Sequence, residues 1–340
     1  MKIAFVSDPH ARGKDLDAFA RQWAALWVHC RIRNVAHVVC GGDMFDKQNI
    51  GDSNAETGAI IRAVTTPFLS YPRSPVFHCI SGNHDQGGAA RVSAVEALRG
   101  LPGVHVYTEP SVADLGNGLD LCLLPWIYGD MVEGLRALAY PSRYRGLLCA
   151  HTQVWGAEMN GVKTATDGIP REHPLWGYFE HIALGDFHKR QQLWPNGGYV
   201  GALRQLNHGE EGNPAGFEIY DTDTRETEWV ELFEAPRYHT SRVYTMEELQ
   251  AFQPKALHYN RVITKGFVAP RDLVLQLEQS DISVSAEVER LVRIDRGAEV
   301  SETALQVPRE LIGVYNGTLD NPFDTDGVAE LERLFDEVIA

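Results

Sequence analysis

The sequence predicts an α/β fold in which layered sheets carry polar side chains at the carboxyl ends of their strands, followed by a small α+β unit. Short apolar runs alternate with segments whose apolar residues recur at helical spacing, which is typical of strands and helices in turn. Five of the apolar runs end in polar residues, and in open α/β sheets this edge is where ligands bind.

The first half of the chain alternates strands and helices. Predicted strands cover residues 2–7, 36–40, 75–80, 104–107, 119–126, 146–150 and 181–184, and predicted helices cover 15–32, 56–69 and 89–98. Three later strands, 198–203, 216–220 and 227–234, are separated by Gly and Asn turns and predict an antiparallel finish to the sheet.

The pattern changes near Pro236. A strand (262–268), a helix (270–279) and a strand (282–288) form a compact unit, and an acidic amphipathic helix follows within 320–340. We therefore divide the chain into a main domain (1–235), a small second domain (236–305) and a C-terminal segment (306–340).

Composition restricts the classes of protein that the chain can belong to. The 340 residues are 44% hydrophobic and 23% charged, as in ordinary globular proteins. Five cysteines without a CxxC pair predict reduced core residues in a cytoplasmic protein, and no apolar run has the length of a signal peptide or membrane span. The net charge of −15 argues against a general basic nucleic-acid binder but leaves room for an enzyme whose metal ions meet the phosphate.

The polar strand ends form one constellation. They read Asp8-Pro9-His10, Gly41-Gly42-Asp43, Gly82-Asn83-His84-Asp85, His151, and Gly185-Asp186-Phe187-His188. Each alone could be a turn or a structural histidine. Together, their carboxylates, carboxamide and imidazoles suit two divalent metal ions about 3.5–4 Å apart, an arrangement that hydrolyses phosphate esters.

These motifs resemble those of the calcineurin-like metallophosphoesterases over roughly residues 1–190. Within that superfamily the chain is most similar to the SbcD-type DNA nucleases and their phage relatives. This narrower likeness depends on Leu124-Pro125-Trp126, on 183–189, and on the stretches 199–202, 210–212 and 216–221, while the unit after Pro236 resembles that family's capping domain. The resemblance implies a layered metallophosphoesterase sandwich.

The resemblance also implies roles for individual residues. One metal would be held by Asp8, His10 and His188, the other by Asn83, His151 and Asp186, with Asp43 bridging both. His84 would steady the transition state or protonate the leaving oxygen, and Asp85 would orient His84. The expected ions are two Mn²⁺, with Mg²⁺ as the alternative.

Asp186 departs from the family pattern, which commonly has Gly-His-x-His where this chain has Gly185-Asp186-Phe187-His188. A third carboxylate lowers the formal charge of the loaded site from +2 to +1, which predicts a preference for Mn²⁺ or Mg²⁺ over Zn²⁺. The alternatives are a labile second metal and a degenerate site.

Contacts with a substrate are predicted from cations next to the motifs. These are Arg12, Lys14, Lys189, Arg190 and Arg204, each of which could equally be a solvated surface charge. Trp126, Trp155 and Trp176 could stack on bases or pack in the core.

The function predicted is two-metal hydrolysis of DNA phosphodiester bonds, by a nuclease subunit that acts in recombination or repair with an SbcC-like ATPase. The acidic C-terminal helix could dock onto that ATPase or pack on its own domain, and a homodimer is left open. One alternative is a phosphatase or phosphodiesterase acting on a small molecule or phosphoprotein. The other is a scaffold that lost activity through Asp186.

Overall fold

The computed structural model describes residues 1–69, 75–86, 92–116, 118–139, 146–159 and 163–287. The predicted acidic helix within 320–340 and the end of the predicted second domain lie outside these residues. Among the helices described, none combines the length and apolar character needed to cross a bilayer.

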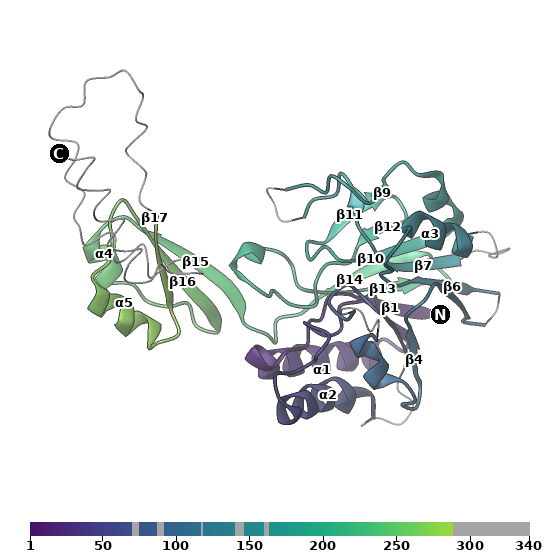
Figure 1. Ribbon diagram of the computed structural model, residues 1–340, viewed down its shortest axis with the longest axis horizontal. Helices are drawn as coiled ribbons and strands as arrows, with labels where there is room; N and C mark the ends of the chain where they lie inside the picture. Colours follow the sequence, from purple (N-terminus) through teal and green to yellow (C-terminus); the bar gives the residue numbers. More distant parts are fainter. Residues whose placement is uncertain (70–74, 87–91, 117, 140–145, 160–162, 288–340) are drawn as a thin grey trace, which may run out of the picture. The chain divides into compact units, whose positions relative to one another are not determined.

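Two six-stranded sheets face each other and confirm the predicted layered α/β sandwich (Figure 1). The first has the order β14 (Glu226–Glu231), β13 (Gly216–Asp221), β1 (Lys2–Val6), β2 (Val35–Cys40), β3 (Val76–Ile80) and β4 (Val104–Tyr107). The second has the order β11 (Gln191–Trp194), β12 (Gly197–Tyr199), β10 (Phe179–Gly185), β7 (Gly146–His151), β6 (Asp120–Leu124) and β5 (Ser111–Asp114).

The central strands of both sheets are parallel. In the first sheet β1 to β4 run in one direction, and in the second β6, β7, β10 and β12 do the same. The predicted antiparallel finish is found for two of its three strands, because β13 pairs antiparallel with β1 and with β14. The third, 198–203, corresponds to β12, which lies in the second sheet and pairs parallel with β10 and antiparallel with β11. Parallel strands have their carboxyl ends at a common edge, so this arrangement can bring distant motifs together.

Apolar side chains bury the sheets on both faces. Ile3, Phe5, Leu123, Leu147 and Ala183 belong to the cluster between the sheets. The outer face of the first sheet is covered by α1 (Leu16–Ile32) and α2 (Asn54–Leu69), and that of the second by α3 (Met131–Ala139) (Figure 1). All five cysteines are free and buried, as expected of core residues.

Three sequence predictions need correction. In its described part the predicted helix 89–98 is only a 3₁₀ turn, Ala94–Leu98, and Ser93 before it forms an isolated antiparallel bridge with Gln86 instead of a helical turn. The predicted strand 119–126 ends at Leu124, since Pro125 has no N–H for the ladder. The predicted strand 198–203 ends at Tyr199, and the chain turns at Gly201 with φ 85°.

Shorter elements connect these layers. They are the 3₁₀ helices Gly13–Asp15, Pro174–Tyr178 and His208–Glu210, and the two-stranded sheet of β8 (Val154–Trp155) and β9 (Ile169–Pro170).

A third sheet follows Pro236. It consists of the parallel strands β15 (Arg237–Val243), β16 (His258–Lys265) and β17 (Ser283–Glu287), with α4 (Met246–Gln250) and α5 (Arg271–Glu278). The helix and two strands predicted for 262–288 correspond to α5, β16 and β17, and Val243, Leu249, Val262 and Ile282 form a separate apolar cluster.

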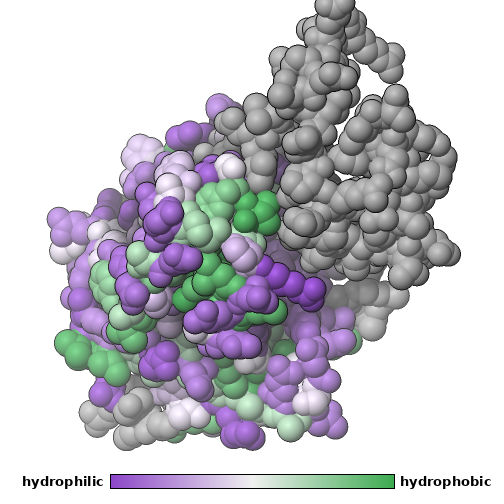
Figure 2. All heavy atoms as spheres, turned by 90° about the vertical axis from the view of Figure 1, so that its left-hand side faces the viewer, coloured by the Kyte–Doolittle hydropathy of each residue, from purple (hydrophilic) through white to green (hydrophobic). Residues whose placement is uncertain are grey.

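On the face of the molecule in Figure 2, hydrophobic side chains gather at the centre and are bordered by hydrophilic ones, which is ordinary for a protein surface.

Three histidines, His37, His78 and His105, lie next to one another across β2, β3 and β4 and form a stack. His78 is hydrogen-bonded to His37 and to the Tyr107 hydroxyl, each at 3.1 Å, and its ring stacks on His105 with a centroid distance of 5.3 Å. Burial, with His37 and His105 nearby, lowers the pKa of His78 to about 3.

This low pKa predicts acid sensitivity of the fold. Between pH 6.5 and pH 3, His78 binds a proton in the unfolded chain but stays neutral in the folded chain. The free energy of unfolding therefore decreases as the pH falls toward 3. At pH 5 the expected loss is about 2 kcal/mol relative to pH 7.5. Urea unfolding in EDTA at both pH values checks it, because His78→Phe should shrink the difference by that amount. An unchanged difference would show that His78 is protonated in the fold.

Candidate metal centre

Five strand-end turns converge at one edge of the sandwich. Asp8 follows β1, Asp43 follows β2, Asn83 follows β3, His151 ends β7, and Asp186 follows β10. Main-chain hydrogen bonds hold neighbouring turns together: Asp8 N donates to Gly42 O (3.2 Å), His10 N to Asp43 O (3.0 Å), and Thr152 N to Gly185 O (3.4 Å). The structure thus brings together the seven residues predicted to bind metal.

The backbone at this edge is strained. Asp8, His10, Asp43 and Asp186 have φ values of 50°, 45°, 51° and 102°, in the left-handed region that non-glycine residues rarely adopt. Each such residue costs on the order of 1–3 kcal/mol and persists only when its surroundings hold it. Four of the seven predicted ligands therefore owe their orientation to the structure around them.

Glycine permits the close approach of the turns. A Cβ at Gly82 would lie 2.0 Å from Asp43 Oδ1, and a Cβ at Gly42 (φ 98°) would lie 2.3 Å from His151 Nδ1. Any side chain at either position would displace a predicted ligand.

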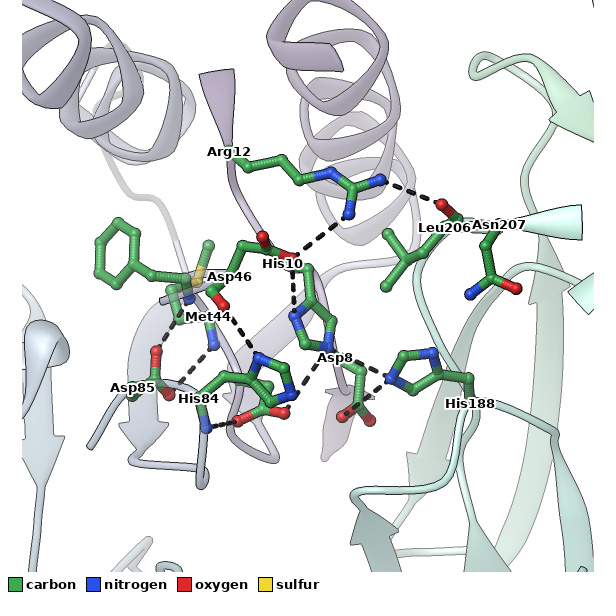
Figure 3. Close-up of polar contacts among 12 residues, drawn as sticks. Asp8, His10, Arg12, Met44, Asp46, His84, Asp85, His188, Leu206 and Asn207 are labelled. Carbon is green, nitrogen blue, oxygen red and sulfur yellow. Dashed lines mark hydrogen bonds and ion pairs between the residues drawn. The ribbon is translucent and has the colours of Figure 1, made fainter. Parts of the chain in front are cut away.

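The first ligand group consists of Asp8, His10 and His188 (Figure 3). His10 Nε2 lies 3.2 Å from His188 Nε2, and His188 Nε2 lies 3.9 Å from Asp8 Oδ1. Asp43 Oδ2 is 3.5 Å from His10 Nε2, so it extends the group toward the second one.

The second group is centred on His151, which is fully buried. Its Nε2 lies 2.8 Å from Asn83 Oδ1, 3.6 Å from Asp43 Oδ1 and 3.7 Å from Asp186 Oδ1. His151 Nδ1 donates to Gly41 O at 2.7 Å, so Nε2 is the ring nitrogen that faces these three oxygens and that could bind a cation together with them. Asp43 is the residue shared by both groups.

The donor set fits a pair of divalent ions. Donor atoms that bind one ion at about 2.0–2.2 Å lie roughly 3–3.5 Å from each other, close to most of the separations found here. Within the described part of the chain, the buried Asp186 Oδ2 has no hydrogen-bond partner. A carboxylate oxygen left in this way inside a cluster of nitrogen and oxygen donors is a suitable ligand for a cation.

The charges of the site also favour the binding of cations. Burial by itself lowers the pKa of His151, but Asp43, Asp8 and Asp186 outweigh it and raise the pKa to about 9. Burial, together with Asp8 and Asp43, raises the pKa of Asp186 to about 6 despite the proximity of His151. Clustered carboxylates of this kind need positive charge, which metal ions would supply.

His84 lies at the exposed side of the site (Figure 3). Its Nδ1 donates to the main-chain oxygen of Asp46 at 2.8 Å, and its main-chain N–H donates to Asp43 Oδ1 at 2.9 Å. The ring meets His10 edge to face with a centroid distance of 4.7 Å. With Nδ1 engaged, Nε2 is the atom of His84 available to a substrate.

Asp85 does not orient His84, contrary to the sequence prediction. Its buried carboxylate accepts hydrogen bonds from the main-chain N–H groups of Gly82 (2.9 Å), Phe45 (2.8 Å) and Met44 (3.2 Å). Burial and Asp43 raise the pKa of Asp85 to about 7. Asp85 therefore ties the turn after β3 to the turn after β2 and does not contact the imidazole.

Asp46 and Glu210 are the site residues that sequence reasoning missed. Asp46 Oδ1 lies 3.5 Å from His10 Nδ1, and its main-chain oxygen accepts from His84. Glu210 Oε1 accepts from His188 Nδ1 at 2.9 Å. Both could have been found in the sequence, because Asp46 stands three residues after Asp43 and Glu210 lies in a stretch that supported the family resemblance.

Two of the five cations predicted to meet a substrate are engaged inside the protein. Arg204, with 1% of its side chain exposed, pairs with Asp15 at 2.7 Å and donates to His10 O at 2.9 Å, which contradicts its predicted phosphate contact. Arg12 pairs with Asp15 at 2.8 Å and with Asp46 at 3.3 Å.

The other three cations lie nearer the surface. Lys14 is exposed, Lys189 pairs with Glu158, and the Arg190 guanidinium lies 4.8 Å from the ring centroid of Trp229. Of the tryptophans, Trp176 is buried in the core, whereas Trp155 is 57% exposed shortly after His151.

Two sequence comparisons bear on the family of this chain. The family model described as calcineurin-like phosphoesterase matches residues 1–233. Exonuclease subunit 1 of Enterobacteria phage T4 is 27% identical over 206 residues, which cover 56% of this chain and 54% of that protein. The chain thus spans about half the length of this curated relative.

Solved structures show more distant likeness. The protein TT1561 of Thermus thermophilus aligns with a TM-score of 0.43 at 14% identity, covering 68% of this chain and 98% of that chain. A novel archaeal phosphodiesterase aligns with a TM-score of 0.36 at 13% identity, covering 68% and 100%. The match of the family model to well over half of the chain is the decisive finding: the chain belongs to the calcineurin-like phosphoesterase family, whose members hydrolyse phosphoesters with divalent metals.

Proposed function

We propose that this chain is a metal-dependent DNA nuclease that hydrolyses phosphodiester bonds. The observation that carries the proposal is the shared carboxylate of Asp43 between two ligand groups, with His84 exposed beside it. The likeness to a phage exonuclease subunit supports DNA as the substrate.

Each residue of the site has a proposed role in binding metal or in hydrolysis. Asp8, His10 and His188 would hold one ion, and Asn83, His151 and Asp186 the other, with Asp43 between them. When bound, such ions polarise a phosphoryl oxygen and lower the pKa of water. His84, oriented by the Asp46 main-chain oxygen, would present Nε2 to the leaving oxygen. With both ring nitrogens protonated, it would deliver the Nε2 proton to that oxygen and keep the Nδ1 proton on Asp46 O.

The substrate is tested by offering DNA beside small phosphate esters. End-labelled linear DNA, single- and double-stranded, is incubated with Mn²⁺, Mg²⁺, Zn²⁺ or EDTA, next to a small phosphodiester and a small phosphomonoester. Manganese-dependent DNA cleavage is expected. Monoester turnover without DNA cleavage would assign the chain to the phosphatase alternative, which its charge of −15 favours.

Asp186 is expected to set the metal preference. Its carboxylate faces His151 at 3.7 Å and adds negative charge where the family commonly has histidine, so Mn²⁺ and Mg²⁺ should support more activity than Zn²⁺. Asp186→His should shift the ratio of zinc-supported to manganese-supported activity toward zinc. Equal ratios in both proteins would contradict this role, and inactivity of both with every metal would favour the scaffold alternative.

An SbcC-like coiled-coil ATPase is the proposed partner. The acidic segment 320–340, which lies outside the described residues, would supply the docking helix. Deleting 320–340 is expected to abolish co-purification with such an ATPase while DNA cleavage by the isolated chain persists. Undiminished binding by the truncated chain would rule out this segment as the dock.

A further inference from the structure

The loop 204–210 lies between β12 and β13 and joins two of the strand-end turns. It is reached through Ala202, whose N–H donates to His188 O (3.0 Å), and Leu203, whose N–H donates to Ser7 O (3.1 Å). Ser7 and Ala202 also form an isolated parallel bridge. The chain therefore enters this loop between the turns that follow β1 and β10, which carry Asp8, His10 and His188.

Arg204 acts on the main chain of His10. Its buried guanidinium binds the Asp15 carboxylate through two bonds, Nη1 to Oδ2 at 2.7 Å and Nη2 to Oδ1 at 2.9 Å. Nη2 also donates to His10 O at 2.9 Å. Since His10 has the unfavourable φ of 45°, this fixed donor is well placed to hold its strained carbonyl, and with it the direction of the imidazole.

Glu210 acts on the ring of His188. Its Oε1 accepts from His188 Nδ1 at 2.9 Å, which directs the Nε2 lone pair toward Asp8 and His10. The carboxylate is itself held, because Leu206 N donates to Oε2 (2.8 Å) and Asn207 Nδ2 to Oε1 (2.7 Å). Glu210 is 7% exposed, so water competes little for these bonds.

The second ligand group is held differently. His151 Nδ1 donates to the main-chain oxygen of Gly41 at 2.7 Å. Among the residues described, no hydrogen bond joins the loop 204–210 to Asn83, His151 or Asp186. The loop thus supports one half of the centre.

We propose that Arg204 and Glu210 are positioning residues for the half of the metal centre formed by Asp8, His10 and His188, and that this loop sets the affinity of one metal ion without the other. The inference rests on the proposed two-metal centre and is independent of DNA as substrate, so the metal alone can test it.

The test is a titration of metal-free protein with Mn²⁺. Calorimetry measures the affinities, and electron paramagnetic resonance distinguishes a magnetically coupled pair of ions from single ions. Wild-type protein is expected to bind two ions. In Glu210→Ala one affinity should fall by about 10–100-fold and the other should stay within about threefold, so that the coupled signal gives way to that of single ions. Glu210→Gln keeps an acceptor for Nδ1 and should restore much of the loss.

Two further variants separate positioning from folding. Glu211→Gln is the matched control, because Glu211 accepts from Thr240 N (3.0 Å) and contacts no predicted ligand. Arg204→Lys keeps the positive charge but loses the pair of hydrogen bonds that the guanidinium makes with Asp15. It should weaken the binding of the same single metal ion as Glu210→Ala does. Equal weakening of both ions, or of neither, in Glu210→Ala would overturn the proposal. Wild-type protein that binds fewer than two ions would overturn the two-metal centre itself, whatever the variants do.

Discussion

Replacement of His84 by alanine is expected to lower the turnover of DNA by about 10²–10⁴-fold while both metal ions stay bound. The reason is geometric. Nδ1 of His84 is committed to the main-chain oxygen of Asp46 at 2.8 Å, and the exposed ring offers Nε2 to a leaving oxygen rather than to either ligand group around Asp43.

The leaving group makes this prediction sharper. A phosphodiester that releases 4-nitrophenolate needs little protonation, so His84→Ala should slow its hydrolysis far less than that of DNA. Single-turnover rates on both substrates, with Mn²⁺ titrations of both proteins, give the comparison. His105→Ala removes an exposed histidine of the stack on β4 and serves as the control.

A metal-binding defect in His84→Ala would contradict this role. His84 also belongs to a cluster with His10 and Asp46 whose potential ligand atoms lie close together. Loss of an ion in the variant would therefore make His84 a ligand, and equal slowing of both substrates would remove its role as a proton donor.

Asp43→Asn is expected to have the largest effect of any single ligand change. Oδ2 of Asp43 faces His10 Nε2 at 3.5 Å, and Oδ1 faces His151 Nε2 at 3.6 Å, so its charge serves both groups. A neutral carboxamide is a weaker ligand, and each ion contributes several kcal/mol to the reaction. We expect both ions to bind more weakly and turnover to fall by about 10³-fold or more.

The comparison with Asp186→Asn tests the bridging position. Asp186 faces only His151 among the predicted histidine ligands, at 3.7 Å, so its variant should lose affinity for one ion. Mn²⁺ titration of the two variants distinguishes the cases. A normal pair of ions in Asp43→Asn, or a defect restricted to one ion, would show that Asp43 does not bridge.

Much of the fold and most of the site could be read from local pattern. The apolar runs that became β1, β2, β3, β7 and β10 are each buried, and the polar residues after them lie together. This succeeds because parallel strands place their carboxyl ends at one edge, so a motif after each strand is also a motif near the others.

Local pattern failed where neighbours in sequence face different partners. Asp85 follows His84 directly, yet its carboxylate binds N–H groups of Met44 and Phe45, about forty positions earlier in the chain, while the His84 ring is held by the Asp46 main chain. Adjacent residues in a turn point in different directions, and only the packing of the turns decides what each meets.

Charge was misread for a related reason. Arg204 was expected at a phosphate, but it is buried against Asp15 and the carbonyl of His10, a residue 194 positions away. Residue type and spacing therefore determined the layered sheets and the polar strand ends, and the resemblance of those motifs to a known family indicated the family and the ligands of the metal centre. The tertiary structure alone decided which residues hold those ligands in place, because that depends on the through-space approach of segments whose separation in the sequence carries no periodic signal.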